Sequence, residues 1–232
     1  MKRESSIGDF WKNIPPGKVP GTTPIDKIFW DYLQEKDKLC EVGCGDGRLI
    51  PELVKRGFMV VCSDINKAAV SSLRGKIEIA GLKNRVSVLK DDICQTKLPR
   101  NWFAGVLMQG VLGSMAKKNR LSALKGVGKI LNAEGVVHIA EFEVMRKPSM
   151  LIRYDLDEKI TGEYGTLSIK DVSGQEIYRT HNFTEEELRM LIRSAKLKLI
   201  SIKRKVFVSY HGRRKPGLVI VAQKYYVRSR KK

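Results

Sequence analysis

The 232-residue sequence has few cysteine and aromatic residues and no long apolar run. Its four cysteines form no CxxC pair, which excludes a disulfide-stapled secreted scaffold and a small zinc module. We therefore expect reduced, buried thiols in a cytoplasmic protein. The longest nearly apolar stretch, 103–116, is too short to span a membrane, and the first residues lead into no apolar segment that would indicate a secretory signal.

Acidic residues are missing from the last fifth of the chain. The whole sequence holds 44 Lys and Arg against 25 Asp and Glu, a formal net charge of +19. Fifteen of the basic residues, and no Asp or Glu, fall within 188–232. Such a basic stretch attracts polyanions through counterion release. RNA or an acidic protein is therefore a candidate partner. The alternative is that the basic residues only keep the protein soluble.

No repeat or low-complexity linker divides the chain, so we expect one domain, residues 1–232. Within it we distinguish four parts by their composition and periodicity. They are an N-terminal arm and helix (1–36), an α/β core (37–143), an insertion (144–182), and a C-terminal helix followed by a basic β-hairpin (183–232).

Short apolar segments alternate with helical patterns through the core. This alternation predicts an α/β fold of the doubly wound, Rossmann-like kind, a mostly parallel sheet with helices on both faces. The last helix of the core is expected to pass Leu131 and end near Gly135. Two final strands, about 199–209 and 218–224, must pair antiparallel because the connection between them is short. The insertion is expected to contain a β-hairpin over 165–182.

A glycine-rich loop follows the first predicted strand, in the sequence Glu41-Val42-Gly43-Cys44-Gly45-Asp46-Gly47. A strand that ends in glycines before a helix brings backbone N–H groups and a positive helix end close to a ligand. The spacing is not the G-x-G-x-x-G of dinucleotide-binding proteins, and no G-K-[ST] of a phosphate-binding loop follows. An ordinary tight turn is the alternative explanation.

Acidic residues end the next two predicted strands. Asp64 ends the second, where a carboxylate can accept both hydroxyls of a ribose. Asp91, Asp92 and Ile93 follow the third, where an acid beside an apolar residue can contact an adenine amino group and ring. Either acid could make that contact, and we favour Asp92.

These motifs, in this order, resemble those of the class I S-adenosylmethionine-dependent methyltransferases over about 39–142. The resemblance implies a seven-stranded sheet with an antiparallel last strand, and S-adenosyl-L-methionine as cofactor. It also implies roles for individual residues. Glu41 would help to hold the methionine ammonium, Gly43, Cys44 and Gly45 would let the cofactor approach the backbone, Asp64 and Ile65 would bind ribose and adenine, Asp92 and Ile93 would contact adenine, and Gln109 would lie between cofactor and acceptor.

The acceptor is not identified by the sequence. No [DN]-P-P-[YF] motif follows the fourth predicted strand, which argues against methylation of an exocyclic base amine, and we find no metal-ligand set and no assigned catalytic residue. In the family the insertion commonly covers a small acceptor, so a small molecule is slightly favoured. The alternatives are an RNA or protein methyltransferase that docks its substrate on the basic C-terminal region, and a non-catalytic nucleic-acid-binding module.

Several residues are secondary candidates for the acceptor site. His181 could serve as a base, although a lone histidine is more often a hydrogen-bonded surface residue, and the tyrosines of the insertion more often pack. Basic residues next to the final strands would lie near the mouth of the site if the sixth strand runs parallel to the core strands. The remaining candidates for the acceptor site are Tyr154, Tyr164 and Tyr178 in the insertion and the segment Arg213-Arg214-Lys215. Phe10 and Trp11 in the arm could close over the cofactor or act as a packing anchor, and the basic tail Arg228–Lys232 would lie at the opposite end.

Overall fold

The computed structural model describes residues 23–208 and 213–225. Phe10, Trp11 and the tail from Arg228 to Lys232, for which we predicted roles, lie outside the described residues. Among the helices in the described ranges, none has the length and apolar character that a membrane crossing requires.

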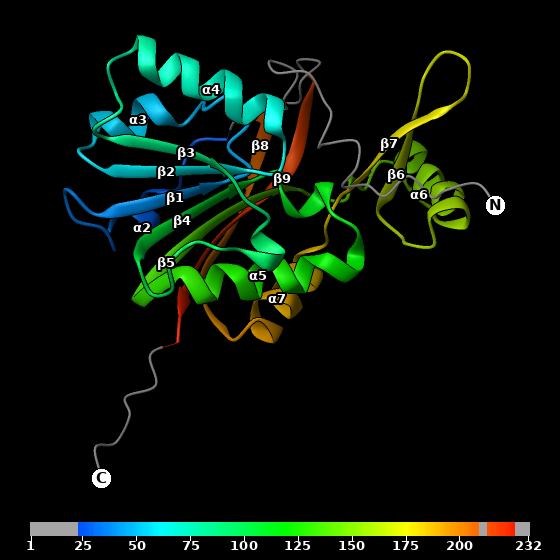
Figure 1. Ribbon diagram of the computed structural model, residues 1–232. Helices are drawn as coiled ribbons and strands as arrows, with labels where there is room; N and C mark the ends of the chain where they lie inside the picture. The colour runs from blue at the N-terminus through cyan, green and yellow to red at the C-terminus, as the bar shows by residue number, and fades with distance from the viewer. Residues whose placement is uncertain (1–22, 209–212, 226–232) are drawn as a thin grey trace.

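A seven-stranded sheet forms the centre of the molecule (Figure 1). Its strand order is β3-β2-β1-β4-β5-β9-β8, and only β9 runs antiparallel to its neighbours. This confirms the predicted mostly parallel, Rossmann-like sheet and places β8 parallel to the core strands. The strands are β1 (Lys38–Val42), β2 (Met59–Asp64), β3 (Val86–Lys90), β4 (Phe103–Gln109), β5 (Leu131–Phe142), β8 (Leu197–Val208) and β9 (Arg214–Lys224).

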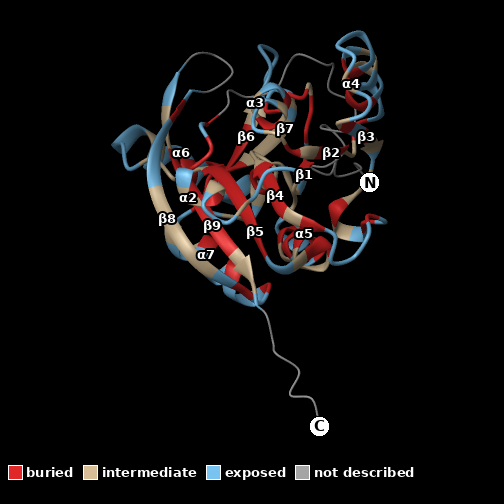
Figure 2. Ribbon diagram, turned by 90° about the vertical axis from the view of Figure 1, so that its left-hand side faces the viewer, coloured by how far each residue is buried: buried red, intermediate tan, exposed pale blue. Residues whose placement is uncertain are grey.

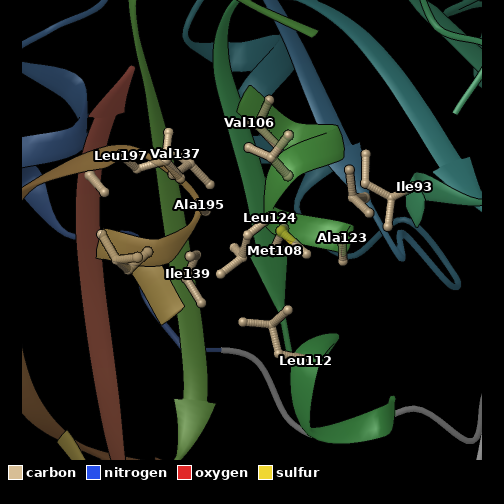
Figure 3. Close-up of a cluster of buried hydrophobic side chains, with 14 of the residues drawn as sticks. Ile93, Val106, Met108, Leu112, Ala123, Leu124, Val137, Ile139, Ala195 and Leu197 are labelled. Atoms are coloured by element: carbon tan, nitrogen blue, oxygen red, sulfur yellow. The ribbon is translucent and has the colours of Figure 1, made fainter. Parts of the chain in front are cut away.

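Helices cover both faces of this sheet, as Figure 1 shows. On one face lie α2 (Lys27–Trp30), α3 (Ile50–Lys55) and α4 (Lys67–Ile79), and on the other lie α5 (Lys117–Ile130) and α7 (Glu185–Ser194). Period-two alternation along each strand sends successive side chains to opposite faces, so the sheet contributes to two apolar clusters. Figure 3 shows the cluster under α5 and α7, in which Met108, Leu124 and Ile139 are fully buried or nearly so.

Side-chain caps fix where two of these helices begin. Asn66 Oδ1 accepts hydrogen bonds from the backbone N–H groups of Ala68 and Ala69 at 2.9 and 3.0 Å, and α4 begins there. Thr184 Oγ1 accepts from the N–H of Glu187 at 3.1 Å at the start of α7. Both caps are predicted by the sequence, because Asn and Thr satisfy the free N–H groups of a first helical turn.

The insertion forms a separate layer at the end of the sheet toward which the parallel strands point (Figure 1). It contains α6 (Pro148–Thr161), β6 (Thr166–Lys170) and β7 (Glu176–His181). The strands β6 and β7 pair antiparallel, which confirms the predicted hairpin. Helix α6 is not predicted from the sequence.

Three other boundaries differ from the predictions. Helix α5 ends at Ile130 and Leu131 already belongs to β5, so the expected continuation toward Gly135 is wrong. The predicted first helix is reduced to the four residues of α2. Arg214 and Lys215 lie within β9, paired with the end of β8, rather than in a loop. Figure 2 shows the buried residues concentrated along the central strands.

Candidate cofactor site at the carboxyl ends of the parallel strands

The glycine loop turns sharply after β1. Gly43, Gly45 and Gly47 have φ values of +68°, +49° and +75°, a region that residues with a side chain rarely adopt. The N–H groups of Gly43 and Cys44 both donate to the carbonyl of Ser63, at 2.8 and 3.1 Å. A Cβ atom at Gly43 would lie 2.7 Å from a methyl carbon of Val111. The loop therefore requires glycine and is held between β2 and the segment after β4.

Asp64 joins the glycine loop to the start of α4. Its Oδ2 accepts a hydrogen bond from the N–H of Gly45 at 2.9 Å, and its Oδ1 accepts from the N–H of Asn66 at 2.8 Å. Burial raises the pKa of this carboxyl, and the backbone donors oppose that shift. Each carboxylate oxygen retains acceptor capacity for a further donor, such as a ribose hydroxyl.

Glu41 lies in β1, on the sheet face that α3 and α4 cover, and is 7% exposed. Burial raises the pKa of its carboxyl to about 8; the charge of Arg48 opposes the shift and that of Asp64 adds to it. The Cys62 thiol lies beside it, with Sγ 3.9 Å from Oε2. An acid in this setting is poised to ionise when a cation comes into contact with it.

The third strand tip lies directly beside the second. The N–H of Asp91 donates to the carbonyl of Asp64 at 3.1 Å. Asp92 Oδ1 accepts from the N–H of Cys94 at 2.9 Å and so begins the short 3₁₀ helix η1 (Ile93–Gln95). Asp91 Oδ1 accepts from the N–H of Lys97 at 3.0 Å, while its Oδ2 is buried without a partner among the described residues. The preference for Asp92 over Asp91 as the adenine contact therefore stays a prediction.

The two isoleucines predicted beside adenine differ in position. Ile65 is half-buried at the tip of β2. The Ile93 side chain is 3% exposed and packs in the apolar cluster beneath α5 (Figure 3). A Cβ atom added at Gly126 of α5 would lie 2.0 Å from the Ile93 carbonyl oxygen, so the helix and η1 are in close contact. The predicted position of Ile93 beside adenine stays a prediction.

The segment after β4 is fixed by a buried acid that sequence reasoning missed. Glu141, 2% exposed, accepts hydrogen bonds from the N–H groups of Leu112 and Gly113 at 2.7 and 3.2 Å. Burial raises the pKa of its carboxyl to about 7, although the hydrogen bonds from these two N–H groups act to lower it. Gln109, at the end of β4, donates from Nε2 to the carbonyl of Thr23 at 2.9 Å, and its Oε1 is buried without a partner among the described residues.

A second polar cluster lies behind that segment, between the insertion, α5 and α7. The cluster contains Glu163, His181 and Glu187. One nitrogen or oxygen atom from each residue lies within 4.8 Å of the corresponding atoms of the other two, a spacing compatible with a metal ion. Their atoms already have partners, however. Arg120 binds both glutamates, and the His181 ring nitrogens lie 2.8 Å from Thr166 Oγ1 and 2.9 Å from Glu187 Oε2. The arrangement is an ion-pair network across three elements.

The secondary candidates in the insertion have different surroundings. Tyr154 is fully buried, and its hydroxyl accepts a hydrogen bond from Asn182 Nδ2 at 2.7 Å. His181 is hydrogen-bonded as expected, but it is 2% exposed and not a surface residue. A cavity of about 290 Å³ opens next to His181. Its lining includes Lys117, Glu158, Tyr164, Asn182 and Thr184, whereas Tyr154 and Tyr178 do not line it.

Arg120, Glu141 and Glu163 are the structural residues that the sequence did not reveal. Each is a charged residue buried or nearly buried in the fold, and each lies in a segment of ordinary composition. The capping box at Thr184 places Glu187 in a first helical turn, but nothing in the sequence indicates that it faces Arg120. A buried charge finds its partner through the tertiary fold, which local patterns do not encode.

Comparison with known proteins agrees with this geometry. Residues 39–135 match a family model described as a methyltransferase domain. The fold is similar to the crystal structure of an S-adenosylmethionine-dependent methyltransferase from Methanosarcina mazei, with a TM-score of 0.80 and 26% identity, covering 88% of this chain and 100% of that one.

Curated relatives match a smaller part of the chain. The eEF1A lysine and N-terminal methyltransferase of Bos taurus is 28% identical over 111 residues, which are 47% of this chain and 16% of that protein. A ribosomal RNA small subunit methyltransferase of Arabidopsis thaliana is 28% identical over 68 residues, 29% of this chain and 19% of that protein. The matches thus span less than a fifth of either relative.

The family match and the structural neighbour cover the part of the chain in which the glycine loop and the three strand tips meet. The predicted fold, with β9 between β5 and β8, agrees with them as well. Residues 39–135 therefore match a methyltransferase domain, and the fold is similar to that of an S-adenosylmethionine-dependent methyltransferase.

Proposed function

We propose that this chain transfers the methyl group of S-adenosylmethionine to RNA bound at the carboxyl edge of the sheet. The cofactor supplies an electrophilic methyl group on a sulfonium, and the transfer is an in-line displacement. The protein then has to hold the two reactants in line and exclude water. The observation that supports cofactor binding is that the ends of β1, β2 and β3 lie next to one another.

Each residue at these tips has a role in binding. The positive-φ backbone at Gly43 and Gly45 lets the cofactor approach the loop closely. Asp64 accepts the ribose hydroxyls, and Asp92 accepts a hydrogen from the adenine amino group. Glu41 faces the methionine ammonium and ionises on contact with it.

The choice of RNA as acceptor rests on where β9 puts its basic residues. Phe142, the last residue of β5, pairs with Gly217, so Arg214 and Lys215 extend beyond the end of β5 on the cofactor side. Burial lowers the pKa of Lys215, and the charges of Arg153 and Arg213 lower it further. Several positive groups therefore gather at this edge, an arrangement that phosphates would stabilise.

A small molecule is the second candidate acceptor. It is favoured by the insertion, because α6, β6 and β7 lie at the end of the sheet toward which the parallel strands point (Figure 1). An acidic protein would also bind a basic edge, and the curated relatives include a named protein methyltransferase. These possibilities are separated by the assay below.

Cofactor binding is tested by calorimetric titration of S-adenosylmethionine into the wild type and into Asp64→Ala. We expect binding that weakens by about tenfold or more in the variant, since a ribose acceptor is lost. Equal heats in both proteins would contradict the site. Binding without any methyl transfer would favour the non-catalytic module.

The acceptor is tested by incubating the protein with methyl-labelled cofactor and fractionated cell extract. We expect the label in RNA; label in protein or in small metabolites would contradict the proposal. RNA binding is then titrated with salt after changing Arg213, Arg214 and Lys215 to Gln. The slope of log K against log salt should become shallower by about 2–3. The matched control changes three exposed lysines on other surfaces, Lys55, Lys118 and Lys125, and should have a smaller effect.

A further inference from the structure

Helix α6 presents an apolar stripe to solvent. Only Tyr154 and Asp157 of its 14 residues are buried. Ile152, Leu156 and Ile160 are 61%, 56% and 52% exposed. A helix that covers a core normally turns its large apolar residues inward, and a row of exposed ones marks an interaction site.

The stripe is straight and centred on Leu156. Residues four apart lie on one face of a helix, so Ile152 and Ile160 flank Leu156 at equal distances, one turn before it and one turn after it. The buried residue Tyr154 lies on the opposite side. The stripe therefore points away from the body of the molecule, and α6 lies on the outside of the insertion in Figure 1.

The charges beside the stripe are arranged in a self-complementary way. Asp155 and Lys159 are both exposed and lie on the same flank of the stripe. If a second α6 lies antiparallel with its Leu156 opposite the first, each Asp155 is displaced along the axis by about 3 Å, two residues of helical rise, from the Lys159 of the other helix and equally from its Asp155. Lys159 lies nearer the line of contact than Asp155, so each Asp155 is closer across the interface to Lys159 than to the other Asp155. The pairing then contains two equivalent ion pairs and a row of Ile and Leu between them.

We propose that α6 is a homodimer interface, in which two copies of this chain pair their α6 helices antiparallel about a two-fold axis at Leu156. A two-fold interface must be complementary to itself, and both the apolar row and its charged flank meet that condition. Because a pair of 14-residue helices buries less surface than a standard interface of about 1,600 Å², the dimer forms at micromolar or higher concentration.

Other occupants fit the stripe less well. An amphipathic helix that binds an anionic membrane carries an excess of Lys and Arg on its polar face. Helix α6 carries Asp155, Asp157 and Glu158 against Arg153 and Lys159, so it has no such excess. The same acidic residues disfavour nucleic acid on this helix.

Sedimentation velocity measures the association from about 1 to 200 µM, a range that covers weak interfaces. We expect the wild type to shift from monomer to dimer with concentration. Leu156→Lys places an ammonium in the centre of the contact and should raise the dissociation constant by about 100-fold. The control is Ile79→Lys, at a residue of α4 that is 90% exposed, and it should leave the association unchanged.

Charge reversal tests the antiparallel geometry itself. Asp155→Lys and Lys159→Asp, each alone, should weaken the dimer by about three- to tenfold, and an equimolar mixture of the two variants should restore it. A wild type that stays monomeric throughout, with or without binding to anionic vesicles, would overturn the proposal. So would a dimer that Leu156→Lys leaves intact. Each readout is independent of cofactor and acceptor, so it stands apart from the proposed activity.

Discussion

Arg120 and Glu163 form a forked ion pair in which two guanidinium nitrogens lie 2.6 and 2.9 Å from the two carboxylate oxygens. The Arg120 side chain is 1% exposed and that of Glu163 is 11% exposed. Arg120 also donates to the carbonyls of Leu112 and Met115, each at 3.3 Å. This arginine of α5 therefore connects the insertion to the segment that borders the cofactor site.

Replacing this arginine should destabilise the protein strongly. Arg120→Met leaves Glu163 and Glu187 without their buried cation, and removing one partner of a buried pair costs about 3–5 kcal/mol. Arg189→Met is the matched control, because Arg189 pairs with Glu185 on the surface of α7 with 45% of its side chain exposed. It should change stability by less than about 1 kcal/mol. Urea unfolding measures both, and equal losses would contradict the buried role.

Glu41 should make stability depend on pH. Its pKa of about 8 in the fold lies above its ordinary value of 4.5, so its stabilising contribution is complete below about pH 4.5 and is lost as pH rises to about 8. Glu41→Gln removes this loss and should be more stable than the wild type by on the order of 2–4 kcal/mol at about pH 8.5, but not at about pH 5. A difference that does not change with pH would contradict the raised pKa.

The same acid should release a proton when the cofactor binds. Contact with the methionine ammonium lowers the pKa of Glu41, so near neutral pH the carboxyl ionises on binding. Calorimetry in buffers with different ionisation enthalpies measures this proton directly. We expect release in the wild type and a smaller release in Glu41→Gln; the same release in both would place the ammonium elsewhere.

A side chain at Gly47 should destabilise the protein. A Cβ atom there would lie 2.5 Å from Leu73 Cδ1 and 2.6 Å from Ile50 Cδ1, and φ is +75°. Gly81 serves as a matched control, because its φ is +67° and a Cβ atom added there would have no other atom within 4 Å. Gly47→Ala should therefore lose about 1–3 kcal/mol more stability than Gly81→Ala. Thermal unfolding compares them, and equal losses would show that the loop can expand.

Asp92 and Asp91 are distinguished by amide variants. Asp92→Asn keeps an oxygen that can cap the N–H of Cys94 but loses the second acceptor, so we expect about tenfold weaker binding of S-adenosylhomocysteine. Asp91→Asn should bind nearly as well as the wild type. The reverse order would assign the adenine contact to Asp91, whose Oδ2 is buried without a partner in the described part of the chain.

The elements that the sequence predicts well are those with a strong local signal. The end of β1 is marked by the glycines that follow it, and the starts of α4 and α7 are marked by Asn66 and Thr184. Helix α6 was missed although Ile152, Leu156 and Ile160 recur at helical spacing, and no capping side chain marks its start at Lys147.

Other features depend on tertiary contacts. The end of α5 was placed too late because Leu131 continues the apolar pattern of the helix while already belonging to β5. The partners of Arg120 and Glu141 lie in segments distant in sequence, and no local pattern identifies them.

The crystal structure of the protein with S-adenosylhomocysteine measures the central claim most directly. We predict the ribose hydroxyls at hydrogen-bond distance, about 2.6–3.2 Å, from the carboxylate of Asp64, with the adenine beside the tip of β3 and the amino-acid part beside the glycine loop. A ribose bound away from Asp64, or an adenosine outside the edge formed by β1, β2 and β3, would contradict the account.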